Sequence, residues 1–412
     1  MPEQDNEQNP SQTRHRAGPL DGLLIADFSR VLAGPYGTML LGDLGATVIK
    51  VESPAGDDTR TWLPPDRNGI ATYYLSINRN KRSIVLDFKD RTDLQLAQEL
   101  ANRADIFIEN FKPGGLAQFG LDYEAVCQHN PGIIYASISG FGTAQGASLP
   151  GYDLMVQAMS GLMSLTGAPD GPAFRSGISV FDVIAGLHVT IGILAALNHR
   201  SHTSEGQHVE VSLLASALSG LVNHTSAYVA GGVVPTRMGN AHPSLFPYEP
   251  LPTADQQLII AVGNNGQFIK LCKILGVPEL ARDPRFANTE DRTHNREALR
   301  PLLVERLRTK PASEWFQKLS AAGVPCGPIN TIEGGVRLAR ELGLDPVVEV
   351  GSGEDAVPMI RHPISFSLTP PRHTLPPPAL GQDSEQIRAW LSQKPQSTLE
   401  QIGKARTSQE KT

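Results

Sequence analysis

The 412-residue sequence is poor in cysteine and has no block of like charge. Its three cysteines, at positions 127, 272 and 326, form no Cys-x-x-Cys pair. This pattern predicts neither a disulfide framework nor a thiolate zinc site, and it favours a reducing, cytoplasmic setting. The formal net charge is −6, with no long run of Lys and Arg. Since nucleic acids and anionic membranes select for such runs, we expect neither as a main partner.

The sequence also has no long unbroken apolar run. The most apolar stretch, residues 178–197, is interrupted by Asp182, His188 and glycines. It therefore predicts a buried helix rather than a membrane span. The polar N-terminus has no apolar core of the kind that a secretory signal carries. We interpret residues 1–19 as a disordered lead.

Several motifs that carry common chemistries are missing. Gly34 and Gly37 do not have the spacing of a dinucleotide-binding Gly-x-Gly-x-x-Gly loop, and Pro35 removes a backbone N–H that a phosphate would need. No Gly-x-Ser-x-Gly or His-Glu-x-x-His motif is present. The histidines at 199, 202 and 208 end a predicted helix and enter a strand. We therefore expect no metal site.

Short apolar runs alternate with helical stretches along the first half of the chain. We expect strands at residues 23–28, 47–52, 83–88, 106–109, 133–138 and 207–212. Helices are expected between them, at 36–44, 92–102, 123–129 and 183–199. This alternation predicts an α/β fold, a doubly wound parallel sheet of the Rossmann-like kind.

The composition of the sequence changes after these alternating segments, and we place the expected domain boundaries from this change. Residues 20–224 are predicted to form the large domain. Residues 225–330, with a strand at 257–262 and helices at 267–275 and 296–310, are predicted to form a smaller α/β domain. A proline-rich connector at 363–378 precedes a final helix at 385–391. The segment 331–412 is expected to return to the large domain.

Asp182, at the head of the long predicted helix, admits two interpretations. It is a favoured N-cap residue, whose carboxylate accepts the free N–H groups of the first turn. It is also placed to react, since the helix dipole would keep its carboxylate ionised at neutral pH. Tyr152 and Asp153, just before another helix, have the same two interpretations, capping or function. The basic run 78–82 is either a solvated turn or a phosphate-binding cluster.

Taken together, these segments resemble the family III CoA-transferases, a group that also contains acyl-CoA racemases of the same fold. The resemblance runs from about residue 20 to 391. It is carried by LLIADFSRVLAGPYGTMLLGDLGATVIKVE, NKRSIVLDFK, ADIFIENFKPGGLAQFGLDYE, NPGIIYASISGFG, GYDLMVQAMSGLMSLTG and DVIAGLHVTIGILAALNHR. The resemblance implies coenzyme A as co-substrate, no metal, and an interlocked homodimer.

The resemblance also implies roles for individual residues. Asp182 matches the catalytic aspartate, with Tyr152 and Asp153 as an active-site tyrosine and its supporting acid. A loop at 238–242 matches a glycine-rich loop over the site, where the backbone of Gly239 and Asn240 would stabilise oxyanions. Contacts to CoA are implied for Val31, Ala33, Leu86, Lys89, Asn110 and Phe111.

The implied chemistry is CoA transfer through an anhydride and a thioester on Asp182. Racemases of the group carry histidine in the position of Tyr152. A tyrosine, with a reference pKa of about 10, is a poor base near neutral pH, which favours a transferase. An α-methylacyl-CoA racemase or epimerase, a CoA-binding protein without catalysis and, less favoured, an NAD-dependent oxidoreductase are the alternatives.

The acyl group is indicated by RMGNAHPSLFPYE, AVGNNGQF and GVPCGPIN. These segments resemble transferases that use succinyl-CoA and small dicarboxylates of the itaconate, malate or hydroxymethylglutarate type. A second carboxylate needs a cationic or polar partner. Arg175, Arg237 and His242 are the candidates, and each is otherwise an ordinary surface or loop residue.

Overall fold

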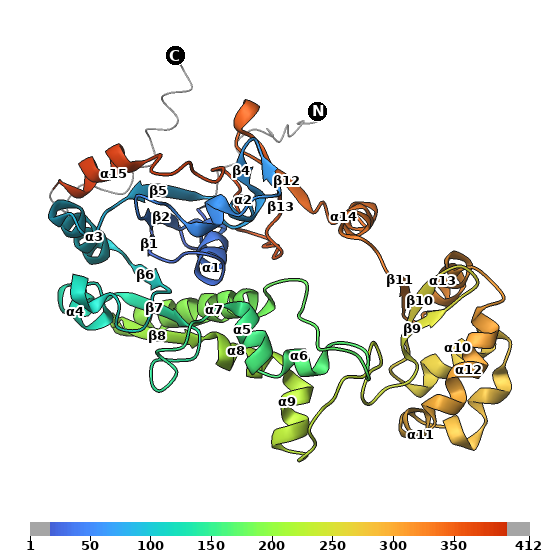
Figure 1. Ribbon diagram of the computed structural model, residues 1–412. Coiled ribbons are helices and arrows are strands. Elements are labelled where there is room, and N and C mark those ends of the chain that lie inside the picture. The colour runs from blue at the N-terminus through green and yellow to red at the C-terminus, as the bar shows by residue number, and fades with distance from the viewer. Residues whose placement is uncertain (1–16, 394–412) are drawn as a thin grey trace, which may run out of the picture. The chain divides into compact units, whose positions relative to one another are not determined.

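A computed structural model describes residues 17–393, so most of the predicted N-terminal lead, residues 1–19, lies outside the described part. The chain divides into two compact units (Figure 1). Among the described residues, unit 1 comprises 17–156, 178–220 and 346–393, and unit 2 comprises 157–177 and 221–345. Unit 1 is therefore built from three separate stretches of sequence.

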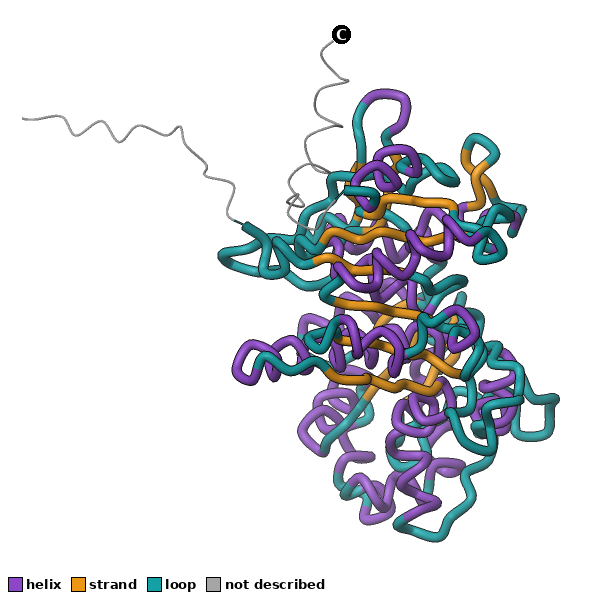
Figure 2. The backbone as a smooth tube through the Cα atoms, turned by 90° about the vertical axis from the view of Figure 1, so that its left-hand side faces the viewer, coloured by secondary structure: helices purple, strands orange, loops and turns teal. Residues whose placement is uncertain are grey.

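Unit 1 is centred on a six-stranded parallel sheet, as the alternating pattern predicted. Figure 2 shows its strands running side by side. In spatial order they are β5 (Lys81–Val85), β2 (Thr47–Glu52), β1 (Leu24–Asp27), β6 (Ile106–Glu109), β7 (Ile134–Ser139) and β8 (Gln207–Ser212). Counting only these six along the chain, the order is 3-2-1-4-5-6, the order of a Rossmann sheet. The strand order reverses between β1 and β6, although all six strands are parallel. In such sheets ligands bind at this point, outside the carboxyl ends of the strands.

Helices cover both faces of the sheet. On one face, α3 (Arg91–Arg103), α4 (Tyr123–His129) and α15 (Ser384–Leu391) contribute to one hydrophobic core with β1, β2 and β6. On the other face lie α1 (Ala33–Asp43), α7 (Val180–Thr203) and α8 (Leu213–Gly220). Strands β1 and β6, at the centre of the sheet, are buried on both sides, which explains why they are short, largely apolar runs rather than alternating ones.

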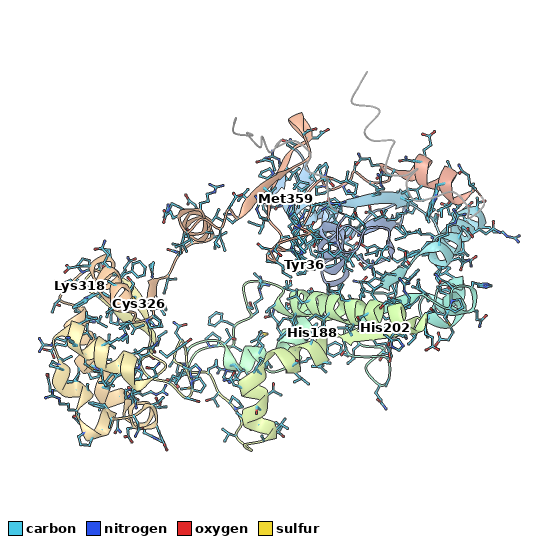
Figure 3. The ribbon with its side chains drawn as sticks, turned by 180° about the vertical axis from the view of Figure 1, so that it is seen from behind. Tyr36, His188, His202, Lys318, Cys326 and Met359 are labelled. Atoms are coloured by element: carbon cyan, nitrogen blue, oxygen red, sulfur yellow. The ribbon has the colours of Figure 1, made fainter. Side chains whose placement is uncertain are left out.

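Helices α1 and α7 pack unusually closely because glycine lies at the contact. A Cβ atom on Gly186 of α7 would lie 2.7 Å from the carbonyl oxygen of Ala33, and one on Gly37 of α1 would lie 3.2 Å from the carbonyl oxygen of Gly186. Tyr36 of α1 and His188 of α7 are labelled on this helix pair in Figure 3. The close contact brings the N-termini of the two helices together at one edge of the sheet.

Helix α1 begins three residues before the predicted start at residue 36. Pro35 lies in its first turn, where backbone N–H groups have no partner within the helix, so a proline is tolerated there. Strand β5 begins at Lys81 rather than at residue 83. Helix α7 extends beyond the predicted 183–199 at both ends, and its length and apolar composition alone would let it cross a membrane. It packs on α1, α8, β7 and β8, as the core helix of a globular unit also does.

The basic run 78–82 is neither of the two things predicted for it. Its members are all buried, and its cations are paired inside the protein. Lys81 bonds Asp27 (3.1 Å), Arg79 bonds Asp43 (2.7 Å) and Arg82 bonds Asp383 (3.2 Å). A solvated turn and a phosphate-binding cluster both require exposed cations, so the run is instead an internal ionic network of unit 1.

Smaller elements surround this sheet. They are η1 (Asp58–Thr61), the hairpin β3 (Asp66–Arg67) and β4 (Ile70–Ala71), α2 (Thr72–Ile77), η2 (Ala117–Phe119), and the antiparallel pair β12 (Val347–Val350) and β13 (Val357–Ile360) with η5 (Gly353–Asp355). Between Arg361 and Asp383 the chain has no helix or strand, in agreement with the predicted connector.

Unit 2 has its own core around a three-stranded antiparallel sheet. The sheet is formed by β11 (Cys326–Pro328), β10 (Gln257–Ala261) and β9 (Tyr248–Pro252). The core is completed by α10 (Asn265–Leu275), α12 (Arg296–Leu307) and α13 (Ala312–Ala321). The remaining elements are α6 (Leu162–Leu165), α9 (Val222–Val229), η3 (Pro278–Ala281), η4 (Pro284–Phe286), α11 (Thr289–His294) and α14 (Ile332–Glu341), while α5 (Asp153–Met159) spans the boundary between the units.

Candidate active site

A cavity of about 390 Å³ opens in unit 1 at the carboxyl edge of the parallel sheet. Its walls come from the segments that follow four strands, 30–33 after β1, 110–113 after β6, 138–140 at the end of β7 and Leu213 after β8. Segment 148–152, Asp58 and Asp182 complete it. The cavity therefore lies at the place where the strand order predicts a ligand. It has a size typical of small-molecule sites.

The first wall is a turn with an unusual backbone. Val31 has φ +68°, a left-handed conformation that is rare for a β-branched residue. Its N–H faces the carboxylate of Asp57, 3.3 Å from Oδ2. Lys50 fixes that carboxylate with a 2.8 Å ion pair and also donates to the carbonyl of Ser29. Such backbone strain persists only where the surroundings impose it, and it is concentrated at functional sites.

Asn110 joins this turn to the second wall. Its side-chain oxygen accepts the N–H of Arg30 (2.9 Å), and its side-chain nitrogen donates to the carbonyl of Arg30 (2.7 Å). The amide of Asn110 therefore holds the two loops together through one accepted and one donated hydrogen bond. Within this structure Asn110 shapes the cavity wall, and its neighbour Phe111 lines the cavity.

Two glycines place Tyr152 and Asp153 beside the end of β7. A Cβ on Gly140 would lie 2.3 Å from the Cα of Gly151, and one on Gly151 would lie 2.7 Å from the Cα of Gly140. Only glycine allows two backbones to approach this closely. As a result Tyr152, which is 64 % exposed, lines the cavity, while Asp153 is buried directly behind it.

Asp182 is not the N-cap of its helix, contrary to the capping interpretation. Helix α7 begins at Val180 with Ser179 as its N-cap, so Asp182 is the third residue of the first turn. The first-turn N–H groups are accepted instead by Asp153, whose Oδ1 lies 2.8 Å from the nitrogen of Phe181 and 3.1 Å from that of Asp182. The side chain of Asp182 is thereby left for the cavity, which it lines.

The acidity of Asp182 also differs from the prediction. Burial, together with the smaller effect of the nearby carboxylate of Asp153, raises its pKa to about 7. With this pKa the protonated and ionised forms are about equal near pH 7, so burial opposes the stabilisation of the anion that we expected from the helix dipole. A titratable group shifted this far in a cavity is typical of catalytic residues.

Tyr73 is a neighbour of Asp182 that our sequence reasoning missed. It lies in α2, hydrogen-bonds the side chain of Ser179, and stacks edge-on against Trp62 with ring centroids 5.0 Å apart. Burial raises the pKa of its phenol, and the charge of Asp182 raises it further. Tyr73 lies far from residues 179–182 in sequence and in no recognisable motif, so only the fold reveals the contact.

The structure brings six of the predicted site residues to the cavity and places others elsewhere. Those that line it are Val31, Ala33, Asn110, Phe111, Tyr152 and Asp182. Leu86 is buried in the hydrophobic core after β5, and Lys89 is exposed. Neither of these two lines the cavity. Asp153 is buried in unit 1 and does not line the cavity either. The remaining five, Arg175, Arg237, Gly239, Asn240 and His242, belong to unit 2.

Within unit 2, the loop 238–242 is held at its N-terminal end. The N–H of Gly239 donates to the carbonyl of Gly167 (3.0 Å), and Nε of Arg237 donates to the carbonyl of Ala168 (3.3 Å). The N–H of Gly239 is thus engaged, and it becomes available to an oxyanion only if that bond opens. Burial lowers the pKa of His242, and the neighbouring His224 and Arg296 lower it further, so at neutral pH its imidazole is a neutral polar group.

Among residues 17–393, no group of three or more His, Cys, Asp or Glu side chains is arranged to hold a metal ion. The titratable side chains that line the cavity are Arg30, Asp58, Lys112, Tyr152 and Asp182. Arg30 is paired with Asp58 (3.4 Å). The arrangement therefore offers one carboxyl nucleophile of raised pKa, with Lys112 as a further cation on the wall, which suits an anionic ligand with an electrophilic carbon.

Comparison with known proteins places this site in context. The model of the family described as CoA-transferase family III matches residues 20–384. The chain is 43 % identical to the succinate–glutarate CoA-transferase of Agrobacterium fabrum, over 92 % of this chain and 96 % of that protein. It is 40 % identical to the succinyl-CoA:glutarate CoA-transferase of Homo sapiens, over 92 % and 87 %. The crystal structure of a CAIB/BAIF family protein from Brucella suis matches with a TM-score of 0.81 and 43 % identity, over 92 % of this chain and all of that one.

Proposed function

Because this chain belongs to CoA-transferase family III, we propose that it moves CoA from succinyl-CoA to a small dicarboxylic acid through covalent intermediates on Asp182. The observation that carries this proposal is the position of Asp182. Its carboxyl lines the cavity, is relieved of helix capping by Asp153, and has a pKa raised to about 7. CoA is the co-substrate, and no metal takes part.

The acceptor is inferred from the relatives and from the polar groups of the chain. Two relatives of about 40 % identity are named for succinyl or succinate and glutarate. We therefore propose a short dicarboxylate, either glutarate itself or an acid of the itaconate, malate or hydroxymethylglutarate type. Arg175, Arg237 and His242 are proposed to bind its second carboxylate. Guanidinium groups pair with carboxylates in bidentate fashion, and the neutral imidazole of His242 can donate one N–H.

The proposed reaction consists of two half-reactions that follow the same steps in opposite directions. The ionised carboxylate of Asp182 attacks the thioester carbonyl of succinyl-CoA; the carbon–sulfur bond breaks, giving an aspartyl–succinyl anhydride and CoA thiolate. The thiolate attacks the aspartyl carbonyl, releasing succinate and leaving an aspartyl–CoA thioester. The incoming dicarboxylate then reverses these steps. Covalent catalysis of this kind divides one difficult exchange into easier ones.

The neighbours of Asp182 have supporting roles in this proposal. Asp153 orients it by accepting the N–H groups at the start of α7, and Tyr152 borders the reacting acyl group. Val31, Ala33, Leu86, Lys89, Asn110 and Phe111 are proposed to contact CoA, directly or by shaping its site. Gly239 and Asn240 are proposed to stabilise the oxyanions through their N–H groups, which for Gly239 requires release from Gly167.

We also propose the assembly and setting in which the enzyme works. Residues 20–224 are taken as the CoA-binding domain and 225–330 as the smaller domain, with 331–412 completing the first. The active form is proposed to be an interlocked homodimer in the cytoplasm, without nucleic acid or membrane as a partner. Large apolar side chains are exposed on α7 and α9, among them Ile191 and Val229. Their exposure supports contact with another protein surface, such as that of the second subunit.

The experiment that tests this proposal is to trap the covalent intermediate. The protein is mixed with succinyl-CoA, treated with hydroxylamine or borohydride, and mapped by peptide mass. We expect the modification on the peptide that contains Asp182. The variant Asp182→Asn, which keeps the size of the side chain, should bind CoA, carry no adduct and transfer nothing. Asp170→Asn is the matched control, because Asp170 is exposed and lies outside the cavity.

Three outcomes contradict the proposal in different ways. Turnover retained by Asp182→Asn would exclude the covalent mechanism. Deuterium uptake at the α-carbon of a branched acyl-CoA, without an adduct, would identify a racemase or epimerase. CoA binding without adduct or exchange, across a panel of acyl-CoA donors, would indicate a CoA-binding protein.

A further inference from the structure

Three polar side chains from three neighbouring strands form a row beneath the second wall of the cavity. They are Glu109 at the end of β6, Ser137 in β7 and His208 in β8. Glu109 and Ser137 are register partners, and His208 pairs with Tyr135, two residues before Ser137. Since residues two apart on a strand share a face, the three side chains project from the same side of the sheet.

Direct hydrogen bonds connect the row to the cavity wall. The carboxylate of Glu109 accepts the N–H of Phe111, with 2.7 Å between Oε2 and nitrogen. The hydroxyl of Ser137 hydrogen-bonds the Glu109 side chain and lies 2.9 Å from Nε2 of His208. Burial raises the pKa of Glu109. When its carboxylate is ionised it only accepts, so Ser137 then donates to Glu109 and accepts from the Nε2–H of His208.

The surroundings hold this row in one arrangement. Glu109 is 8 % exposed. The imidazole of His208 stacks on Tyr123, with centroids 4.9 Å apart and planes at 21°, and meets the edge of Tyr135. A buried carboxylate is costly unless it is hydrogen-bonded, and here the polar partners of Glu109 are the N–H of Phe111 and the hydroxyl of Ser137.

The wall above the row depends on these contacts. The side chain of Asn110 is occupied by Arg30, so it fixes the 30–33 turn relative to residue 110. The N–H of Phe111 is fixed by Glu109. The loop after β6 is therefore fixed at two successive residues. Asn110 connects it to the 30–33 turn, and Phe111 connects it to Glu109.

We propose that Glu109 is a positioning residue for acyl-CoA binding. It holds Phe111 and, through it, the loop 110–113 in the conformation that receives CoA, while Ser137 and His208 keep its carboxylate in place. This inference rests on the proposed function, because it assigns the wall to CoA. It concerns binding of the cofactor moiety rather than the reacting carbonyl, so it predicts an effect on KM and not on kcat.

The test compares three variants of the full-length protein. Glu109→Ala removes the acceptor and should raise both the KM for succinyl-CoA and the Kd for CoA about tenfold, with kcat changed less than about twofold. Glu109→Gln keeps an oxygen that accepts from Phe111, so it should restore KM to within about twofold of the wild type. Ser137→Ala removes the hydroxyl that bonds both the Glu109 carboxylate and His208, and it should raise KM about threefold.

Controls separate positioning from general damage. Glu124→Ala, at an exposed site on α4, should leave KM, kcat and Tm unchanged. Ser137→Ala keeps the test decisive if Glu109→Ala does not fold. The binding of CoA is measured by titration calorimetry alongside the steady-state rates, so that KM changes are checked against a true dissociation constant.

The results that would overturn the inference are distinct from those that would overturn the function. If the wild type binds CoA and transfers it, but Glu109→Ala and Ser137→Ala both keep wild-type KM, Glu109 has no positioning role. The same holds if Glu109→Gln is as impaired as Glu109→Ala, or if kcat falls while KM stays. If the wild type binds no CoA at all, the proposed function itself fails, and this inference with it.

Discussion

At the scale of single residues, the acidity of Asp182 is set by two opposed influences. The first turn of a helix favours an anion, whereas burial and the charge of Asp153 disfavour it. The net result is a pKa of about 7. The ionised nucleophile is therefore fully available only above neutral pH. The same raised pKa makes the carboxylate more basic, and so more reactive toward a thioester.

This acidity predicts the pH dependence of the first half-reaction. Because only ionised Asp182 attacks, kcat/KM for succinyl-CoA should rise between about pH 6 and pH 8 with a midpoint near 7. The measurement is the single-turnover rate of aspartyl–CoA formation over this range at constant ionic strength. A flat profile would show that Asp182 is ionised throughout.

The contribution of Asp153 to that midpoint is separable from its structural role. Asp153→Asn removes the negative charge but retains an oxygen that can accept from Phe181 and Asp182. The midpoint should therefore move to lower pH, while remaining above the ordinary aspartate value because burial still acts. Asp153→Ala, which also loses the acceptor, should in addition lower Tm. An unchanged midpoint in Asp153→Asn would show that burial alone sets the acidity.

Sequence reasoning reached Asp182, Tyr152 and Asp153 because they lie in recognisable segments, but it misassigned their interactions. The cap of α7 comes from Asp153, 29 residues before Asp182, a pairing that local spacing does not reveal. Tyr73 and Glu109 were missed for the same reason. Their partners, Ser179 and Ser137, are brought to them only by the packing of α2 and the pairing of β6 with β7.

At the scale of elements, the helices and strands were predictable where composition alone determines them. Strands β2, β6 and β8 and helix α4 have the predicted bounds. The run 78–82 shows where this fails, since its charges indicated solvent exposure. Their partners Asp27, Asp43 and Asp383 are remote in sequence, and a buried cation is recognisable only once its anion is placed.

The contact between α1 and α7 predicts a penalty for adding one methyl group. Gly186→Ala would improve helix propensity, but its Cβ would lie 2.7 Å from the carbonyl oxygen of Ala33, a backbone atom that cannot rotate away. We expect a loss of stability of about 1–3 kcal/mol and a higher KM for acyl-CoA, as Ala33 is displaced. Gly335→Ala in α14 is the control, because nothing lies within 4 Å of its added Cβ. Equal effects of the two substitutions on Tm would refute the close-contact argument.

A second element-scale prediction concerns the anchoring of segment 242–246 in unit 2. Arg296 donates to the carbonyls of His242 (3.2 Å) and Pro243 (3.3 Å), and Thr293 donates to that of Ser244 (3.1 Å). Arg296→Met should speed amide hydrogen exchange in residues 240–246 about tenfold, because it removes the two hydrogen bonds that Arg296 donates. Arg308→Met, at the exposed opposite end of α12, should leave that exchange unchanged. Protection equal to the wild type in Arg296→Met would show that other contacts fix the segment.

At the scale of the whole molecule, unit 1 is completed only by the last part of the chain. Residues 372–391 return to the sheet after the chain has built unit 2. Asn80 receives the N–H groups of Thr374 and Leu375, Arg388 pairs with Asp93, and Trp390 joins the hydrophobic core. The first 156 residues therefore contain five of the six strands but not the contacts that close their outer edge.

The joint between β5 and the returning segment predicts how the unit loses stability. Asp383 pairs with the buried Arg82 (3.2 Å) and accepts the N–H of Ser83 (3.0 Å). Asp383→Ala leaves both groups without this acceptor, and removing one partner of a buried pair costs roughly 3 kcal/mol. We expect Tm to fall by several degrees, and limited proteolysis to release the C-terminal segment before it cleaves within the sheet. Glu385→Ala, two residues away and exposed, should change neither. If Asp383→Ala and Glu385→Ala have the same Tm and the same cleavage pattern, the closure of unit 1 depends on the packing of α15 rather than on the pair of Asp383 and Arg82.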